Sequence, residues 1–294
     1  MNKVGFIGVG IMGKSMVRNL MKAGFELHIY ARTKSKVEDV ISEGAQFHES
    51  IKDCVQDCDA VITIVGFPQD VEEVYFDEGN ILDSAKEGAY LIDMTTTSPQ
   101  IAEKIYAEGT KRDFHVMDAP VTGGDTGAKA GTLSILVGGE KEDYEACMPL
   151  FEAMGTNINY QGKAGCGQHC KLANQIMIAG TLSGVCEALT YAKEQGLDPE
   201  VFMKSVATGA AGSKQLDTFG PKILKDDYAP GFFMKHFIKD MKLALIEANR
   251  KGLSLDVLSM VLANYEELEQ EGYGDLGTQA LMKFYDEEHR NTEE

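Results

Sequence analysis

Lys171 lies in a polar cluster inside an otherwise apolar segment, in the run Cys170-Lys171-Leu172-Ala173-Asn174-Gln175. Asn174 and Gln175 follow it at i+3 and i+4, which places all three on one face of a helix. A lysine donates a proton most readily when burial lowers its pKa from ~10.4 toward neutrality. The segment therefore predicts an acid–base lysine, and the alternative is a solvent-exposed lysine on an amphipathic helix.

A glycine-rich turn near the start of the chain has the spacing that dinucleotide binding requires. A short apolar strand expected over residues 4–7 runs into Gly8-Val9-Gly10-Ile11-Met12-Gly13 and then into a helical pattern. The three glycines permit a tight turn, a close backbone approach and close helix packing. The free N–H groups at the start of the helix, around Ile11 and Met12, then point at a pyrophosphate. This strand–turn–helix context predicts a nicotinamide dinucleotide cofactor.

The residues after the second expected strand favour NADP(H) over NAD(H). NAD enzymes usually place an acidic residue there, which accepts hydrogen bonds from the adenosine ribose. That acid is absent from this chain, which instead has Ala31, Arg32, Thr33 and Lys36. A guanidinium binds phosphate through two hydrogen bonds, so Arg32 suits a 2′-phosphate. The alternative is that Arg32 stacks on adenine and that the enzyme uses either cofactor.

Two more loops follow expected strands, at the ends where open sheets bind ligands. Val65, Gly66 and Phe67 form the first loop, and Thr96 lies in the second. We expect both to contact the cofactor, with Thr96 bonded to its nicotinamide half. The alternative for the second loop is that its threonines only make turn and cap bonds.

The run from Asp118 to Gly124 contains a hydroxyl followed by two glycines, Thr122-Gly123-Gly124. Consecutive backbone N–H groups exposed by such glycines form a nest that binds a carboxylate without a charged side chain. The same pattern fits a structural glycine turn beside a buried Asp118. Spacing alone leaves both interpretations open.

The elements that position these residues change character midway along the chain. In the first half, short apolar runs alternate with helical patterns, which is typical of a doubly wound parallel sheet. The expected strands are residues 4–7, 27–30, 60–65, 90–92, 115–117 and 133–137. The expected helices are residues 11–23, 34–43 and 98–108, the last with Ser98 as N-cap, Pro99 at its first position and Gly109 after its end.

The second half reads as helical almost throughout. Helices are expected over residues 168–195, 199–208, 215–224, 237–251, 254–271 and 278–285, followed by an acidic tail with Glu287, Glu288, Glu293 and Glu294. The predicted fold class is therefore α/β plus all-α. A Rossmann dinucleotide-binding domain covers residues 1–162 and an all-helical domain covers residues 163–294. We expect the long helix to join them, with the active site in the cleft between them.

Composition excludes several classes of partner. The chain has 294 residues and a formal charge of −18, from 46 acidic and 28 basic residues. Such a charge repels phosphate backbones and anionic membranes, so we expect no nucleic-acid or membrane partner. No stretch approaches the ~20 apolar residues that span a bilayer, and the chain starts directly with an expected structural strand. A cytoplasmic location is expected.

The six cysteines are expected to be reduced thiols, since no secretory signal accompanies them. Cys166, His169 and Cys170 have helical spacing that suits a metal. No second ligand pair with zinc-like spacing accompanies them, and Cys54 and Cys58 lie in another part of the chain. We therefore expect no metal.

The motifs together resemble the β-hydroxyacid dehydrogenase family. The resemblance rests on the 8–13 turn, the 118–124 block continuing to Gly131-Thr132-Leu133, the 165–175 block and Lys239-Asp240, and it covers essentially the whole chain. The family includes 3-hydroxyisobutyrate dehydrogenase, tartronate semialdehyde reductase and glyoxylate/succinic semialdehyde reductases. Its helical domain is similar to that of 6-phosphogluconate dehydrogenase.

The resemblance implies a role for each matching residue. Lys171 is catalytic and Asn174 helps to orient the substrate, whose carboxylate is held by Thr122, Gly123 and Gly124. Thr96 and Lys239 contact the cofactor, while Phe232 and Asp240 line the site. The alternative for Lys239-Asp240 is a surface ion pair, which contributes little to stability. One departure is visible, because the family usually has serine where this chain has Thr122, and the added methyl narrows the pocket.

The sequence therefore predicts an NADP(H)-preferring reductase of a short β-hydroxy acid or its semialdehyde, active as a homodimer or homotetramer. One alternative is a decarboxylating enzyme of the 6-phosphogluconate type, whose substrate phosphate needs a basic pocket that this acidic chain does not indicate. The other is a dinucleotide-binding, redox-sensing protein without catalysis, which the intact Lys171 and the Thr122–Gly124 run disfavour.

Overall fold

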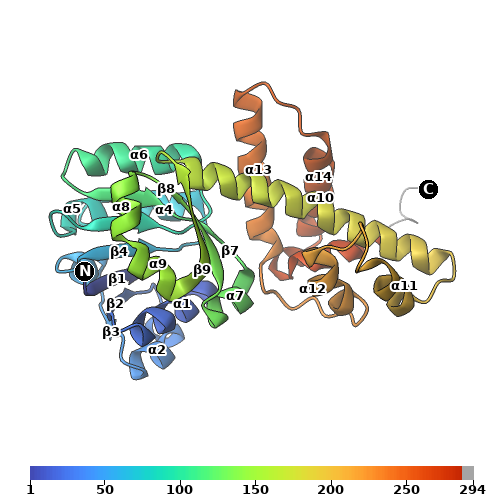
Figure 1. The fold of residues 1–294 in the computed structure, drawn as a ribbon, viewed down its shortest axis with the longest axis horizontal. Helices are drawn as coiled ribbons and strands as arrows, with labels where there is room; N and C mark the ends of the chain where they lie inside the picture. Colours follow the sequence, from blue (N-terminus) through green and yellow to red (C-terminus); the bar gives the residue numbers. More distant parts are fainter. Residues whose placement is uncertain (287–294) are drawn as a thin grey trace. The chain divides into compact units, whose positions relative to one another are not determined.

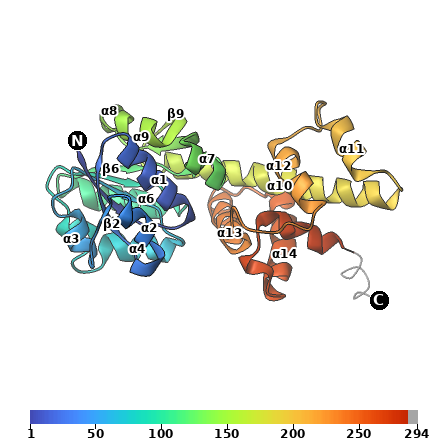
Figure 2. The same ribbon diagram turned by 90° about the horizontal axis from the view of Figure 1, so that it is seen from below.

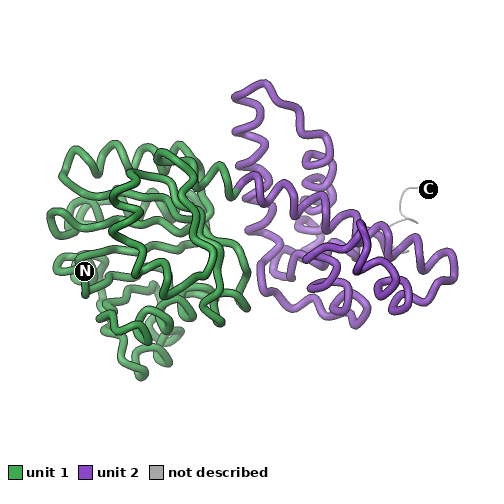
Figure 3. Tube along the Cα trace, viewed as in Figure 1, with its two compact units in different colours: residues 1–171 green, residues 172–294 purple. Residues whose placement is uncertain are grey.

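The computed structural model describes residues 1–286, which form two compact units (Figure 3). The first unit is Met1–Lys171 and the second begins at Leu172. The division falls inside one long helix, α10, which spans Cys166–Glu194. The predicted acidic tail from Glu287 to Glu294 lies outside the described residues.

The first unit is built on a sheet with the strand order β3-β2-β1-β4-β5-β6-β8-β7, and β9 pairs with β8 (Figure 1). Its strands are β1 Lys3–Ile7, β2 Glu26–Tyr30, β3 Gln46–Phe47, β4 Ala60–Thr63, β5 Tyr90–Asp93, β6 His115–Asp118, β7 Val121–Thr122, β8 Leu133–Gly138 and β9 Gly155–Gly162. The six predicted strands are confirmed, whereas β3, β7 and β9 were not predicted. β3 and β7 have two residues each, and β9 is largely exposed, so none carries a clear apolar period.

The sheet is not parallel throughout, which corrects one part of the prediction. Strands β1 to β6 pair in parallel, but β8 runs antiparallel to β6 and β7. Mixed sheets with such an antiparallel edge are common among doubly wound folds. The predicted fold class is otherwise confirmed.

Helices cover both faces of the sheet and form two separate cores. One face carries α1 Ile11–Lys22, α2 Glu38–Ser42, α7 Gly124–Ala130 and α9 Met148–Met154. The other face carries α3 Ile51–Val55, α4 Pro68–Phe76, α5 Ile81–Ser84 and α6 Pro99–Thr110, and α8 is Lys141–Ala146. Both faces of the parallel strands are therefore buried, which explains why these strands read as continuous apolar runs.

Two predicted helices differ in their bounds from the observed ones. Over residues 34–43 the chain forms a short 3₁₀ turn, η1 Lys34–Lys36, and then α2, with Val37 between them at φ −124°. The helix predicted to stop before Gly109 continues to Thr110, although Ser98 is its N-cap as predicted. Gly109 lies inside this helix, where a Cβ would come within 2.5 Å of Val116 Cγ2, so this glycine serves close packing.

The second unit is helical (Figure 2). It has its own apolar core. After α10 it contains α11 Pro199–Val206, α12 Lys214–Ile223, α13 Met234–Arg250 and α14 Asp256–Gln270, followed by η2 Tyr273–Asp275 and η3 Thr278–Tyr285. The predicted final helix over 278–285 is thus a 3₁₀ segment. Tyr265 helps to fix it, because its hydroxyl donates a buried 2.7 Å hydrogen bond to the Thr278 carbonyl.

Helix α10 also corrects the expectation that no stretch is long and apolar enough for a membrane. By length and composition alone its 29 residues suffice, with a mean hydropathy of 1.2. Core helices of water-soluble proteins meet the same criteria, and α10 contributes Leu172, Leu182, Cys186 and Leu189 to the core of the second unit. The helix is therefore weak evidence for a membrane span.

Candidate active site

The carboxyl ends of five parallel strands meet at one edge of the sheet in the first unit. Ile7 pairs with Tyr30 on one side and Thr63 on the other, Thr63 pairs with Asp93, and Asp93 pairs with Asp118. The loops that follow these residues, together with the first turns of the helices after them, hold every cofactor residue predicted before residue 100. The loop after Asp118 leads to Thr122, Gly123 and Gly124. The register therefore brings the predicted residues of this unit to one edge, where open α/β sheets bind ligands.

The glycine turn after β1 fits a dinucleotide. Gly8 has φ +98°, and a Cβ there would lie 2.1 Å from the Ile64 carbonyl oxygen, so no other residue is accommodated. A Cβ on Gly13 would lie 2.1 Å from the Gly8 carbonyl oxygen. Gly10 faces open space, and no side chain caps the first turn of α1. Uncapped N–H groups at an open helix start are suited to a pyrophosphate.

Arg32 lies just beyond β2 with 70% of its side chain exposed. Its Nη2 is 2.9 Å from Oδ1 of Asp70, whose other oxygen accepts a 2.9 Å hydrogen bond from the Phe67 backbone. Asp70 therefore ties the end of β2 to the loop after β4. Asp70 was not predicted as a site residue. Its capping position in α4 is a local signal, but its hydrogen bond to Arg32 joins residues that lie 38 positions apart in the sequence.

The threonine loop after β5 is fixed through its backbone. The Thr95 hydroxyl accepts a 2.9 Å hydrogen bond from the Val65 backbone, and the Thr95 N–H donates a 3.1 Å bond to Asp93. Thr95 and Thr97 are buried, whereas Thr96 between them is half-buried. Thr95 and Thr97 therefore have structural roles, and cofactor binding by Thr96 stays a prediction.

Asp118 is a buried structural anchor and lies just before the predicted carboxylate nest. Its two oxygens accept hydrogen bonds of 2.7 Å from Gly165 N–H and 2.8 Å from Gln168 N–H, at the start of α10. Burial raises the pKa of Asp118 despite these bonds. Thr122 is half-buried, while Gly123 and Gly124 are exposed with φ of +132° and +65°. Asp118 is therefore structural, and carboxylate binding by the exposed glycines stays a prediction.

Lys171 lies in the second turn of α10 and only 7% of its surface is exposed. The alternative of a solvent-exposed surface lysine is therefore wrong. A buried lysine beside the sheet edge that carries the cofactor loops is typical of a functional group, because burial of an ammonium is otherwise costly.

The polar residues predicted in the second unit are joined through Gln175. Asn174 Nδ2 donates to Gln175 Oε1 at 2.7 Å, and Gln175 Nε2 donates to Asp240 Oδ2 at 2.6 Å. Lys239 Nζ lies 3.0 Å from the other Asp240 oxygen, with side chains 12% and 1% exposed. The surface-pair interpretation of Lys239-Asp240 is therefore wrong. Phe232 stands apart from this chain at 36% exposure and contacts the rings of His236 and Phe237.

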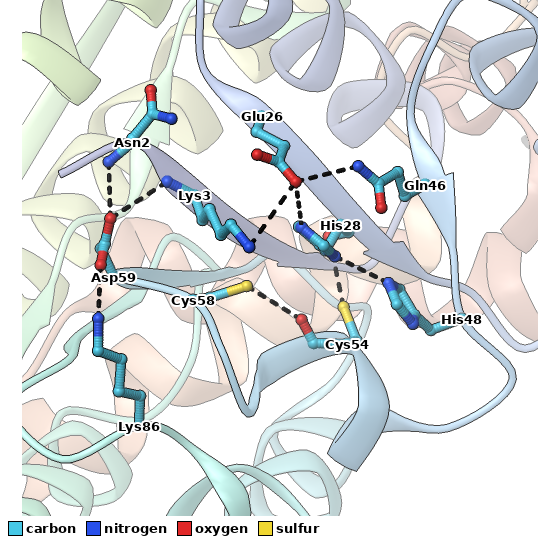
Figure 4. A network of polar contacts seen from close by, with 10 residues as sticks. All are labelled: Asn2, Lys3, Glu26, His28, Gln46, His48, Cys54, Cys58, Asp59 and Lys86. Atoms are coloured by element: carbon cyan, nitrogen blue, oxygen red, sulfur yellow. Dashed lines mark hydrogen bonds and ion pairs between the residues drawn. The ribbon is translucent and has the colours of Figure 1, made fainter.

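Another polar network lies at the β2–β3 edge (Figure 4). His28 Nδ1 and His48 Nε2 share a 2.9 Å hydrogen bond, and His28 Nε2 lies 3.1 Å from Glu26. Burial and the neighbouring His28 lower the pKa of His48. The network contains none of the predicted site residues, and both ring nitrogens of His28 already have hydrogen-bond partners.

The cysteines do not form a metal centre within residues 1–286, where no group of three or more potential ligands converges. Burial raises the pKa of Cys54 well above its usual value and that of Cys58 to about 12. Burial also raises the pKa of Cys170. Metals bind the thiolate, so these environments disfavour a metal.

Comparison with protein families assigns both halves of the chain. Residues 3–162 match the NAD binding domain of 6-phosphogluconate dehydrogenase. Residues 165–285 match the family described as NAD-binding of NADP-dependent 3-hydroxyisobutyrate dehydrogenase. The chain belongs to the β-hydroxyacid dehydrogenase family. It is a nicotinamide-dependent oxidoreductase.

Other members of the β-hydroxyacid dehydrogenase family are similar over nearly the whole chain. An uncharacterized oxidoreductase of Bacillus subtilis is 49% identical and covers 96% of this chain and 98% of its own length. The probable 3-hydroxyisobutyrate dehydrogenase-like 1 of Arabidopsis thaliana is 44% identical over 95% of this chain and 84% of its own. The Mycobacterium tuberculosis 3-hydroxyisobutyrate dehydrogenase structure with L-serine is 26% identical, with a TM-score of 0.87 over 96% and 98% of the two chains.

Proposed function

We propose that this dehydrogenase is an NADP(H)-preferring enzyme that interconverts a short β-hydroxy acid and its semialdehyde. The observation that carries the proposal is the burial of Lys171, three residues after Gln168, whose backbone is held by Asp118 at the sheet edge. A buried amine at that place supplies the proton that carbonyl reduction requires. The names of the Arabidopsis and Mycobacterium relatives support the same class of substrate.

The predicted catalytic residues and the predicted carboxylate site each have a role in this proposal. The bound cofactor supplies or accepts the hydride. The backbone N–H groups of Thr122, Gly123 and Gly124 hold the substrate carboxylate, and the Thr122 hydroxyl adds a hydrogen bond. Lys171 protonates the carbonyl oxygen in reduction and removes the hydroxyl proton in oxidation. Asn174 orients the substrate, and Asp240 holds Asn174 in place through Gln175.

The preference for NADP(H) rests on Arg32. Its guanidinium has five N–H donors, and the ion pair with Asp70 engages only part of them. Asp70 thereby orients the guanidinium while leaving N–H groups for a 2′-phosphate, to which Thr33 and Lys36 add further donors. Glycines 8, 10 and 13 and the start of α1 hold the pyrophosphate.

A panel of substrates tests the proposal. Rates are measured for glyoxylate, succinic, tartronate and methylmalonate semialdehydes with NADPH and NADH, and for L-serine and 6-phosphogluconate with NADP⁺ and NAD⁺. L-serine is included because it is a short β-hydroxy acid and is named with the Mycobacterium structure. We expect a semialdehyde with NADPH to give the highest kcat/KM. Fastest turnover of 6-phosphogluconate would instead support the decarboxylating alternative, and no turnover at all would support a non-catalytic protein.

A further inference from the structure

Gln168 clamps the backbone on both sides of Thr96. Its side chain is fully buried, and both ends of its amide are used. Nε2 donates a 2.7 Å hydrogen bond to the Thr95 carbonyl, and Oε1 accepts a 3.0 Å bond from the Thr97 N–H. The two bonded residues flank Thr96, so a single side chain spans the loop that we assign to the nicotinamide half of the cofactor.

The backbone of the same glutamine is fixed from the opposite side. Its N–H donates a 2.8 Å hydrogen bond to Asp118 Oδ2, and Asp118 Oδ1 accepts from Gly165 N–H at 2.7 Å. Gly167 permits this close approach, because a Cβ there would lie 2.7 Å from the Asp118 carbonyl oxygen. The first turn of α10 is therefore held against the end of β6 while its Gln168 side chain holds the loop after β5.

These contacts join the groups of the proposed reaction in one network within the first unit. Lys171 follows Gln168 by three residues on the same helix, so the helix backbone fixes the position of Lys171 relative to Gln168. Thr95 extends the network through its hydroxyl, which accepts a 2.9 Å bond from Val65 in the loop after β4. Each polar group of Thr95 thus has a partner: Val65 at the hydroxyl, Asp93 at the N–H and Gln168 at the carbonyl.

We propose that Gln168 is a positioning residue, which sets the distance between the cofactor loop around Thr96 and the proton donor Lys171. The proposal rests on the proposed function of these two residues. Only an uncharged amide of this length bonds a carbonyl and an N–H at the same time. Glutamate lacks the donor for Thr95, and leucine leaves two buried backbone groups without partners.

The test compares Gln168→Glu and Gln168→Leu with the wild-type enzyme. The hydride-transfer rate is measured in single turnovers with NADPH and with 4-deuterated NADPH, using the best semialdehyde of the panel. Because a displacement of about 1 Å lowers rates by up to ~100-fold, we expect a loss of roughly 10- to 100-fold in both variants. The deuterium isotope effect on kcat should rise, since hydride transfer then limits turnover, while the NADPH Kd changes less.

A separate readout shows whether the clamp itself is lost. Amide hydrogen exchange should accelerate in the peptide covering residues 93–100 in both variants, with the 3–30 segment unchanged. Tyr265→Phe is the control, because it removes another buried side-chain bond to a backbone carbonyl, in the second unit. It should lower the Tm and leave hydride transfer and its isotope effect as in the wild type.

The outcomes separate the two proposals. Faster exchange at 93–100 with hydride transfer within twofold of the wild type overturns the positioning role and leaves the proposed function intact. Unchanged amide exchange at residues 93–100 would mean that Gln168 does not hold this loop, and it overturns the positioning role as well. If the wild-type enzyme turns over no member of the panel, the proposed function is wrong, whatever the exchange data show.

Discussion

Gln175 donates a 2.6 Å hydrogen bond from Nε2 to Oδ2 of Asp240, and both side chains are at most 2% exposed. A carboxylate accepts hydrogen bonds and donates none, so the Gln175 amide has one allowed orientation. Its Oε1 then faces Asn174, which must donate from Nδ2. The charge on Asp240 thereby fixes the orientation of the Asn174 amide through Gln175.

Gln175→Glu should disrupt this chain, because it places two carboxylates together where the wild type has a donor and an acceptor. A hydrogen bond to a charged group contributes about 1.5–3 kcal/mol, so we expect the free energy of unfolding to fall by at least that amount. The second change Asp240→Asn should restore part of the loss, since an asparagine donates to the new glutamate. Urea unfolding of the two single variants and the double variant measures the coupling. If the double variant loses as much free energy of unfolding as the two single variants together, the two side chains do not depend on one another.

Asp93 should make stability depend on pH. Burial raises the pKa of its carboxyl from 3.8 to about 6, although Thr63 and Thr95 donate hydrogen bonds to it. The folded state therefore holds the proton more tightly than the unfolded state, and the contribution of Asp93 to stability falls as pH rises from about 4 to 6. Above that window the contribution of Asp93 to the free energy of unfolding has fallen by its full amount, on the order of 3 kcal/mol.

The comparison of wild type with Asp93→Asn isolates this effect from other carboxyls. The variant should gain stability relative to the wild type between pH 4 and 7, when unfolding by urea is measured across that range. If the difference in free energy of unfolding between the two proteins stays constant with pH, Asp93 ionises alike in the folded and the unfolded state.

Arg32→Asp should move cofactor preference from NADPH toward NADH, because it removes a phosphate ligand and supplies a ribose acceptor. A charge-assisted contact is worth about 1.5–3 kcal/mol, so the ratio of kcat/KM for NADPH over NADH should fall by about tenfold or more. Asp70→Asn is the matched control, because it releases Arg32 from its ion pair and keeps the guanidinium. This control should retain the preference for NADPH, and an unchanged ratio in Arg32→Asp would rule out a 2′-phosphate contact.

Cofactor binding should stabilise the enzyme against heat. A ligand at a hundredfold excess over its Kd adds ~2.7 kcal/mol when it binds only the folded state. The Tm is therefore expected to rise with NADPH far more than with AMP, which lacks the pyrophosphate and the nicotinamide. Equal shifts with both ligands would mean that the glycine turn and the Thr96 loop do not act together.

Much of the fold could be predicted from the sequence because its signals are local. The 8–13 turn combines a preceding strand with Gly8 and Gly13, which have no room for a Cβ, and these constraints are visible in the residue types. The two-residue strands β3 and β7 carry no such period, and their pairing depends on neighbours far along the chain. The break at Val37 and the packing role of Gly109 likewise depend on tertiary contacts.

The contacts within the site were less predictable. Lys171 and Asn174 stand out as polar residues in an apolar helix, whereas Gln168 is an unremarkable residue whose side-chain partners lie more than 70 positions away. The same holds for Asp70, whose bond to Arg32 joins two different loops. Such long-range hydrogen bonds leave no periodic signal in one sequence.

The central claim is that Lys171 carries the proton, and Lys171→Met tests it most directly. Methionine keeps most of the side-chain volume and removes only the charge and the proton. The decisive measurement is kcat for semialdehyde reduction by NADPH, with the NADPH Kd measured in parallel. A positioned acid–base group contributes roughly 10²–10⁴-fold, so kcat should fall by that factor while the Kd stays nearly unchanged. If Lys171→Met retains most of the wild-type kcat, another group supplies the proton and the account is contradicted.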